Sequence, residues 1–473
     1  MTVAPSSTSQ PSANRPPPEV LTECIPPFVE HLYRWYVTAA ILIMLTAGGS
    51  WGSWMLWQIG LSHQFTSVSI HAINAHGQAQ IYGWMGLFIM GFGYHLLPRF
   101  WRATLVAPRL APLVLLLVTL GVLLRTLGVV LLGLSSSAIP LALTGCVLQL
   151  LAICCFATQM LLTCRHGKTS FRPESGFILG AMAWFVLMGA FDTFHTWNTL
   201  AAPTPEALLH DITTYQGPLR DLQVHGLALF MILGISSRMI PAFYGRPVTP
   251  PLRGWCAFAL LTTAVLAEVL LFIATQWTHI PRLADWLVLP WIMLAVGLFL
   301  QVWPWKLWRT PRRVDRSDKF IRIAYAWLAL SLAMLLLLPL YQALAGLPLG
   351  HAYYGVAYIG AIRHAFTVGF VSLMIVGMSA RFIPAIAGIP SRNLSRLLAP
   401  FLLINLGCFL RVSLQTLTDR YPAIYPLLGI SSLFEIAGFV AWSFDILSIM
   451  WRSPKRRKSS RAPASVSPPI DHP

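Results

Sequence analysis

The chain has 473 residues, of which 56% are hydrophobic and only 10% are charged. A single soluble core could not hide so large an apolar fraction, so a soluble globular protein is excluded and an integral membrane protein is predicted. The net charge of +17 does not indicate nucleic-acid binding, because the basic residues gather beside apolar segments, at 306–322 and 455–461. Basic runs in such places set membrane topology and contact anionic lipid.

Taken in chain order, the sequence divides into a tail, a membrane domain and a second tail. Residues 1–30 are rich in Ser, Pro and Thr and are predicted to be a disordered tail. The membrane domain is predicted over 31–451, followed by a basic tail over 452–473. A helix needs about 20 apolar residues to cross a bilayer. Segments that meet this length are 32–61, 71–98, 106–133, 138–164, 175–199, 219–243, 252–275, 282–306, 321–345, 357–385, 395–415 and 424–451. The predicted fold class is therefore all-α, with twelve transmembrane helices.

The second of these segments carries a pattern that recurs in the sixth and the tenth. Two columns of glycine and one of proline repeat at a spacing of 143 residues: Gly83, Gly226 and Gly369; Gly91, Gly234 and Gly377; Pro98, Pro241 and Pro384. A fixed period of this kind indicates an internal repeat. The chain is therefore predicted to consist of three four-helix units, near 32–164, 175–306 and 321–451, related by pseudo-threefold symmetry.

The orientation of the helices follows from the loops, because Lys and Arg concentrate on the cytoplasmic side of a membrane. The basic loops are those near 99–109, 165–174, 246–253, 306–322 and 381–396, whereas the loops between them hold almost no basic residue. Both termini are therefore predicted to be cytoplasmic. The repeated helices then run from the outside inward, and their histidines lie in the outer half of the membrane.

Those histidines are the candidate ligands, because an imidazole inside a bilayer must face the protein interior and find a partner. Positions 71, 78 and 82 share one face of an α-helix. After subtraction of the repeat offset, His364 falls on position 78 and His225 on position 82, so His71, His225 and His364 occupy equivalent faces of three helices. His76 points elsewhere. The pattern indicates one or more metal centres between helices.

Other polar side chains are expected at the same depth. Asp192 and His195 lie near the outer end of the fifth segment, and Glu268 lies in the outer part of the seventh. A carboxylate beside a ligating histidine would fix the tautomer of that histidine, and His195 is a further candidate metal ligand. The alternative for His195 is a helix-end residue that contacts water or lipid headgroups. The same alternative applies to His63, His210 and His351.

The residues of the repeated pattern resemble known families. The stretch NAHGQAQIYGWMGLFIMGFGYHLLPRF at 74–100 resembles a haem-ligating helix of haem-copper oxidase subunit I. SSRMIPAFYGR at 236–246 and RHAFTVGFVSLMIVGMSARFIPAIAG at 363–388 resemble the NnrS family, which is distantly similar to those oxidases. The resemblance implies three four-helix arcs, haem and copper bound in the outer half of a bacterial inner membrane, and a role in nitric oxide metabolism or resistance to nitrosative stress. His76 and His364 match family motif positions.

The chain departs from both patterns at several positions. The NnrS pattern has two histidines spaced HxH and then a glutamate on the second helix, where this chain has Asn74, His76 and Gly77. The oxidases have two histidines spaced HxH on the tenth helix, where His364 stands alone, and they carry adjacent histidines on a later helix, whereas 252–275 contains none.

The resulting hypothesis is a haem-binding and copper-binding membrane protein of the NnrS type, with nitric oxide or another diatomic gas as its small-molecule partner. Any haem is expected to be b-type, because the chain has no CxxCH motif for covalent attachment. Three alternatives stay open: a respiratory protein similar to haem-copper oxidase subunit I, a secondary transporter without metal, and a structural or assembly subunit that binds no metal. The sequence does not decide whether the protein is an enzyme.

Overall fold

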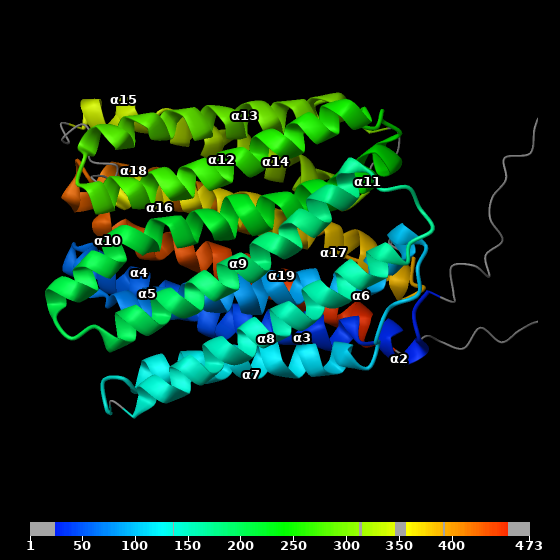
Figure 1. Ribbon diagram of the computed structural model, residues 1–473, viewed down its shortest axis with the longest axis horizontal. Helices are drawn as coiled ribbons and strands as arrows, with labels where there is room; N and C mark the ends of the chain where they lie inside the picture. The colour runs from blue at the N-terminus through cyan, green and yellow to red at the C-terminus, as the bar shows by residue number, and fades with distance from the viewer. Residues whose placement is uncertain (1–23, 136, 312–314, 346–355, 391–392, 453–473) are drawn as a thin grey trace, which may run out of the picture.

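A computed structural model describes residues 24–135, 137–311, 315–345, 356–390 and 393–452 of the chain. Every regular element among these residues is a helix, and the long helices lie side by side along one direction (Figure 1). The predicted all-α class is thus confirmed.

The helices are named in chain order, with α for α-helix and η for π- or 3₁₀-helix. The first half contains α2 (Pro27–Glu30), α3 (Tyr33–Ile43), η1 (Met44–Ser50), α4 (Trp51–Ser62), η2 (Phe65–Ser67), α5 (Ile70–Gln78), η3 (Ala79–Gly86), α6 (Leu87–Trp101), α7 (Leu110–Leu131), α8 (Ala138–Arg165), α9 (Pro173–Ala201), α10 (Pro205–Asp221), η4 (Leu222–Ala228) and α11 (Leu229–Tyr244). The second half contains α12 (Pro251–Thr278), η5 (Pro281–Leu287), α13 (Val288–Val302), η6 (Trp303–Trp305), α14 (Asp318–Leu336), α15 (Leu338–Leu344), α16 (Val356–His364), η7 (Ala365–Ser372), α17 (Leu373–Ile386), α18 (Leu398–Thr418), η9 (Pro422–Leu427) and α19 (Leu428–Met450).

Eleven helices among the described residues are long and apolar enough to cross a membrane, so the chain is a multi-pass membrane protein. The predicted span at 71–98 is helical over α5, η3 and α6 but does not reach the hydropathy of the other eleven. Its first turns carry five polar side chains: His71, Asn74, His76, Gln78 and Gln80. The predicted span 321–345 is interrupted after α14, because Pro339 lies in the first turn of the separate short helix α15, where a proline is tolerated.

The structure describes little of the two predicted tails. Residues 1–23 and 453–473, which make up most of the two predicted tails, lie outside the described residues, and so does His351. Pro27–Glu30, near the end of the first predicted tail, forms the short helix α2. α2 and the end of α19 lie at the same end of the bundle (Figure 1). Nearby, Trp35 and Trp451 pack edge to face with their ring centroids 5.0 Å apart.

The three helices that carry the repeated pattern are the most buried in the bundle. Over Pro205–Tyr244 and Ala357–Ile386, 67% of the apolar stretch is buried, against 33% in α12 and α18. By contrast, α7 turns large exposed apolar side chains outward, among them Leu116, Leu123 and Leu127. An apolar outer face is expected where helices meet lipid.

The glycine columns have a packing role in these inner helices. A Cβ atom on Gly83 would lie 2.4 Å from Ile43, and a Cβ on Gly369 would lie 2.6 Å from the ring of Trp327. A Cβ on Gly226 would lie 3.1 Å from the ring of Trp184. Each of these glycines therefore lets its helix lie close to the helix before it, α3, α14 and α9 respectively.

Candidate functional site

Each inner helix widens into a π-helical segment at the same place in the repeat. The segments η3, η4 and η7 begin at Ala79, Leu222 and Ala365, which are 143 residues apart. π-Helical turns are rare and occur frequently at functional sites. The residue just before each segment is polar and different in each repeat: Gln78, Asp221 and His364. Each of these three residues lies in or beside a polar cluster, and the three clusters consist of different side chains.

The first cluster is built around a buried ion pair between Arg125 of α7 and Asp192 of α9. Arg125 donates hydrogen bonds to both carboxylate oxygens of Asp192 and, over 2.7 Å, to the hydroxyl of Thr196. The Tyr82 hydroxyl donates to the same carboxylate over 2.8 Å. Gln149 accepts from Arg125 over 3.4 Å. All these side chains are buried, so the charges of Arg125 and Asp192 are balanced inside the membrane domain.

His71 lies beside this first cluster. It lines a small cavity together with Arg125 and Thr196. The face shared by positions 71, 78 and 82 therefore points toward α7, α8 and α9, because Gln78 donates to Thr126 of α7 and accepts from Gln149 of α8, and Tyr82 donates to Asp192 of α9. His71 supplies an imidazole, a preferred ligand of haem iron and copper, beside this first cluster.

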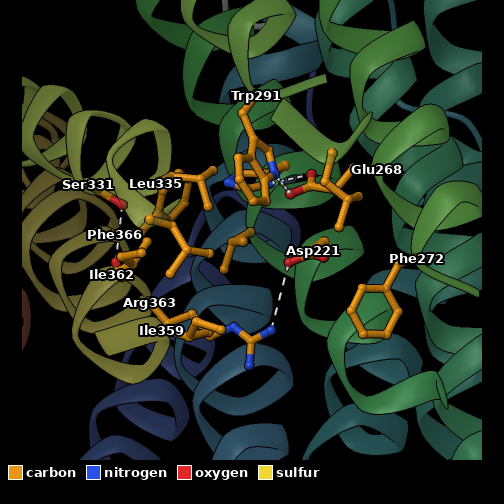
Figure 2. Close-up of a pocket in the computed structure, with 14 residues that line it drawn as sticks. Asp221, Glu268, Phe272, Trp291, Ser331, Leu335, Ile359, Ile362, Arg363 and Phe366 are labelled. Carbon is orange, nitrogen blue, oxygen red and sulfur yellow. Dashed lines mark hydrogen bonds and ion pairs between the residues drawn. The ribbon is translucent and has the colours of Figure 1, made fainter. Parts of the chain in front are cut away.

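The second cluster contains Asp221, His225 and Glu268, from α10, η4 and α12. The Nδ1 atom of His225 lies 2.8 Å from a carboxylate oxygen of Glu268. The second oxygen of Glu268 accepts from the indole of Trp291 over 3.1 Å (Figure 2). Arg363 approaches Asp221 from α16, with 3.8 Å between the nitrogen and the oxygen (Figure 2). One possible ligand atom from each of the three residues lies within 4.8 Å of the others. A cavity of about 50 Å³ adjoins them.

The third cluster contains His76 and His364, which approach each other from two different inner helices. Nδ1 of His76 is 2.8 Å from the backbone carbonyl of Gly48, and a Cβ atom on Gly52 would lie 2.5 Å from the imidazole. The His76 ring is close enough to His364 and Arg411 for their charges to interact. Nε2 of His364 is 3.3 Å from the carboxylate of Glu435. This third cluster brings together the two histidines that match family motif positions.

A polar network connects His195 and Asn74. Nε2 of His195 lies 2.7 Å from the amide oxygen of Gln216, and the Gln216 amide donates to Asn74 over 2.6 Å. The guanidinium of Arg220 donates to the same Asn74 oxygen over 2.8 Å. A Cβ atom on Gly77 would lie 2.8 Å from Arg220. The two positions at which the chain departs from the family pattern on this helix thus accommodate an arginine from α10.

The four predicted histidine ligands therefore do not gather at one centre. Among the described residues, one group of three or more His, Cys, Asp or Glu side chains has its ligand atoms within 4.8 Å of one another. It consists of Asp221, His225 and Glu268. His76 and His364 are neighbours, His225 lies with two carboxylates, and His71 lies beside an ion pair. His63 and His210 are exposed, and His63 stacks on Tyr425.

Three charged residues of the clusters were not predicted, because the sequence analysis gave most weight to histidines. They are Arg125, Asp221 and Arg411. Alignment of the three repeats would have identified these residues. Arg125, Glu268 and Arg411 occupy one position of the 143-residue repeat. Gln78, Asp221 and His364 occupy another. Charged residues recurring at one position of apolar helices mark an interior site.

Comparison with known proteins agrees with the resemblance seen in the motifs. No curated protein matches the chain. The family model described as NnrS protein matches residues 27–453. This range contains all three repeated helices and all three polar clusters, and it covers nearly the whole chain. The chain belongs to the NnrS family.

Proposed function

We propose that the protein binds haem and copper in a bacterial inner membrane and acts on nitric oxide, or protects the cell against it. Membership of the NnrS family and the multi-pass fold support this proposal. The observation that carries it is the third cluster, in which His76 and His364 come from two inner helices, next to π-helical turns, and lie near enough for their charges to interact.

The donor atoms of the third cluster fit a haem iron. The contact between His76 Nδ1 and the carbonyl of Gly48 holds a proton on Nδ1 and leaves Nε2 available as a ligand. In His364 the contact to Glu435 engages Nε2 and leaves Nδ1 available. One imidazole is enough to hold haem iron, and the iron then supplies an open position for a diatomic gas.

Arg411 adds a second reason to propose an anionic cofactor here. Its Nε and Nη1 atoms are buried and have no hydrogen-bond partner among the described residues. A buried donor without a partner costs about 1–3 kcal/mol, and more when it is charged. A carboxylate of a bound haem would remove this cost by accepting hydrogen bonds from Arg411.

Copper is the second metal of the proposal, because imidazole nitrogen also suits copper. His71 and His225 remain the proposed further imidazole ligands. Their partners differ from those of His76, so haem and copper would occupy separate places in the bundle rather than one shared centre.

The proposed architecture is twelve helices in three four-helix arcs related by pseudo-threefold symmetry. The common 143-residue spacing of η3, η4 and η7 and of the glycine contacts supports it. The proposed topology has both termini in the cytoplasm, with the three clusters in the outer half of the lipid bilayer. The distribution of Lys and Arg supports this orientation.

The test is the cofactor content of protein purified from membranes in detergent. We expect a haem absorption band and copper by elemental analysis in the wild type. His364→Ala and His76→Ala should each lose or shift the haem band, whereas His210→Ala, on the exposed side of α10, should not. Wild-type protein without haem and copper would overturn the proposal and favour a transporter or a metal-free subunit. Unchanged spectra in both cluster variants would exclude this site.

A further inference from the structure

The second cluster has an unusual charge balance for the interior of a membrane domain. Asp221 and Glu268 supply two carboxylates whose oxygens lie within 4.8 Å of each other and of His225. Among the described residues, the nearest guanidinium is that of Arg363, 3.8 Å from Asp221, while His225 lies 2.8 Å from Glu268 and forms an ion pair with it when its imidazole is protonated. Glu268 and His225 are buried, at 4% and 5% exposure. Two carboxylates this close in a low-dielectric interior repel each other unless a positive charge or a proton lies between them.

The repeats reveal how the equivalent position is balanced elsewhere. Glu268 occupies the column in which the first repeat has Arg125 and the third has Arg411. In the first cluster, the guanidinium of Arg125 is the positive charge that meets Asp192. In the third cluster, Arg411 interacts electrostatically with Glu435. The middle repeat replaces this internal cation by a carboxylate and places an acid and a histidine beside it.

We propose that Asp221, His225 and Glu268 bind one divalent transition-metal ion of the Zn²⁺, Fe²⁺ or Mn²⁺ class, separately from the haem site and in place of copper at His225, which leaves His71 as the imidazole proposed for copper. One imidazole nitrogen and two carboxylates form a donor set that suits these ions, whereas Cu⁺ prefers thiolate and thioether sulfur. The three residues come from three helices that are held together by the surrounding bundle. The ion takes the place that an arginine side chain fills in the other two repeats.

The surroundings of the three ligands are those of a metal site with room for one more ligand. The Trp291 indole donates to one oxygen of Glu268, and Arg363 approaches Asp221, so both carboxylates are oriented by a second residue (Figure 2). The adjoining cavity of about 50 Å³ is lined on its far side by apolar residues such as Leu335 and Ile362. Since a water needs about 10–15 Å³ of such space, the cavity accommodates water or a small molecule at an open coordination position.

The first experiment is Zn²⁺ binding by the full chain in detergent, after treatment with a chelator. Equilibrium dialysis and elemental analysis should give one tightly bound Zn²⁺ in the wild type. Glu268→Gln should weaken this site at least 100-fold, because it removes an anionic ligand with little change in shape. Asp285→Asn, which alters an exposed carboxylate, should bind Zn²⁺ as the wild type does. Haem content, measured as the pyridine complex, should be equal in all three proteins.

A second experiment uses only the wild-type protein and does not depend on a variant's folding. Dicyclohexylcarbodiimide reacts with protonated carboxyl groups in apolar surroundings, and mass spectrometry locates the product. In metal-free protein we expect labelling at Glu268 or Asp221, and Zn²⁺ should suppress it at least tenfold.

Equal Zn²⁺ binding by the wild type and Glu268→Gln, or labelling that Zn²⁺ does not suppress, would overturn the proposal. Such a result would mean that a proton, held by the carboxylates or by His225, balances the charge in place of a metal ion. Haem content is measured independently, so either outcome leaves the haem proposal separately testable.

Discussion

Replacing Asp192 by Asn removes the charge that balances Arg125 inside the membrane domain. The Asn side chain keeps the shape and part of the hydrogen bonding but leaves the guanidinium without a counter-charge. At the 3.0 Å between Arg125 Nη2 and Asp192 Oδ1, an effective dielectric constant of about 20 gives an attraction of about 5.5 kcal/mol. Measured losses on removing one partner of a buried pair are about 3–5 kcal/mol. We expect Asp192→Asn to lower the free energy of unfolding by about that amount.

The assay is unfolding by a denaturing detergent in mixed micelles, followed by tryptophan fluorescence. Glu206→Gln is the control, because Glu206 is exposed at the start of α10 and its replacement should change stability by less than about 0.5 kcal/mol. The double variant Arg125→Met with Asp192→Leu should recover most of the loss, since apolar side chains of similar volume can replace a buried ion pair. If Asp192→Asn were as stable as Glu206→Gln, the ion pair would not stabilise the bundle and the electrostatic reasoning would be refuted.

Two further predictions concern packing and topology. Gly369→Ala should destabilise the protein by about 1–3 kcal/mol, since its Cβ would lie 2.6 Å from the Trp327 ring, whereas Gly133→Ala, with open space around it, should be neutral. In intact cells, a membrane-impermeant maleimide should label a cysteine placed at His210 but not one placed at Arg309, both exposed positions at opposite ends of the bundle. The reverse labelling would invert the proposed orientation.

Length and hydropathy predicted most of the helices, because each crossing needs a long apolar stretch and most of these stretches end at a Pro or at a polar loop. The break after Leu336 is an exception, since the apolar run continues past Pro339 while the helix does not. The first of the three repeated helices, predicted at 71–98, is another. Its polar first turns, which carry His71 and His76, lower its hydropathy below that of the other crossings.

The polar clusters were predictable only in part. The periodicity of an α-helix identified the face shared by positions 71, 78 and 82, and these positions in the first repeat do turn toward α7. What the periodicity of single helices could not predict is which residues lie opposite that face. Arg125 lies on α7 of the first repeat and Asp192 lies on α9 of the second. Their pairing therefore depends on how whole repeats pack against each other. The rule that a buried charge needs a partner would have directed attention to them.

The central claim is that this protein holds a haem that binds a diatomic gas. The most direct measurement is the absorption spectrum of the purified, reduced wild-type protein before and after addition of nitric oxide, recorded beside His364→Ala. We predict a haem band that shifts when nitric oxide is added, and a loss or change of that band in the variant. Purified protein without a haem band, or with a haem band that nitric oxide leaves unchanged, would contradict the claim.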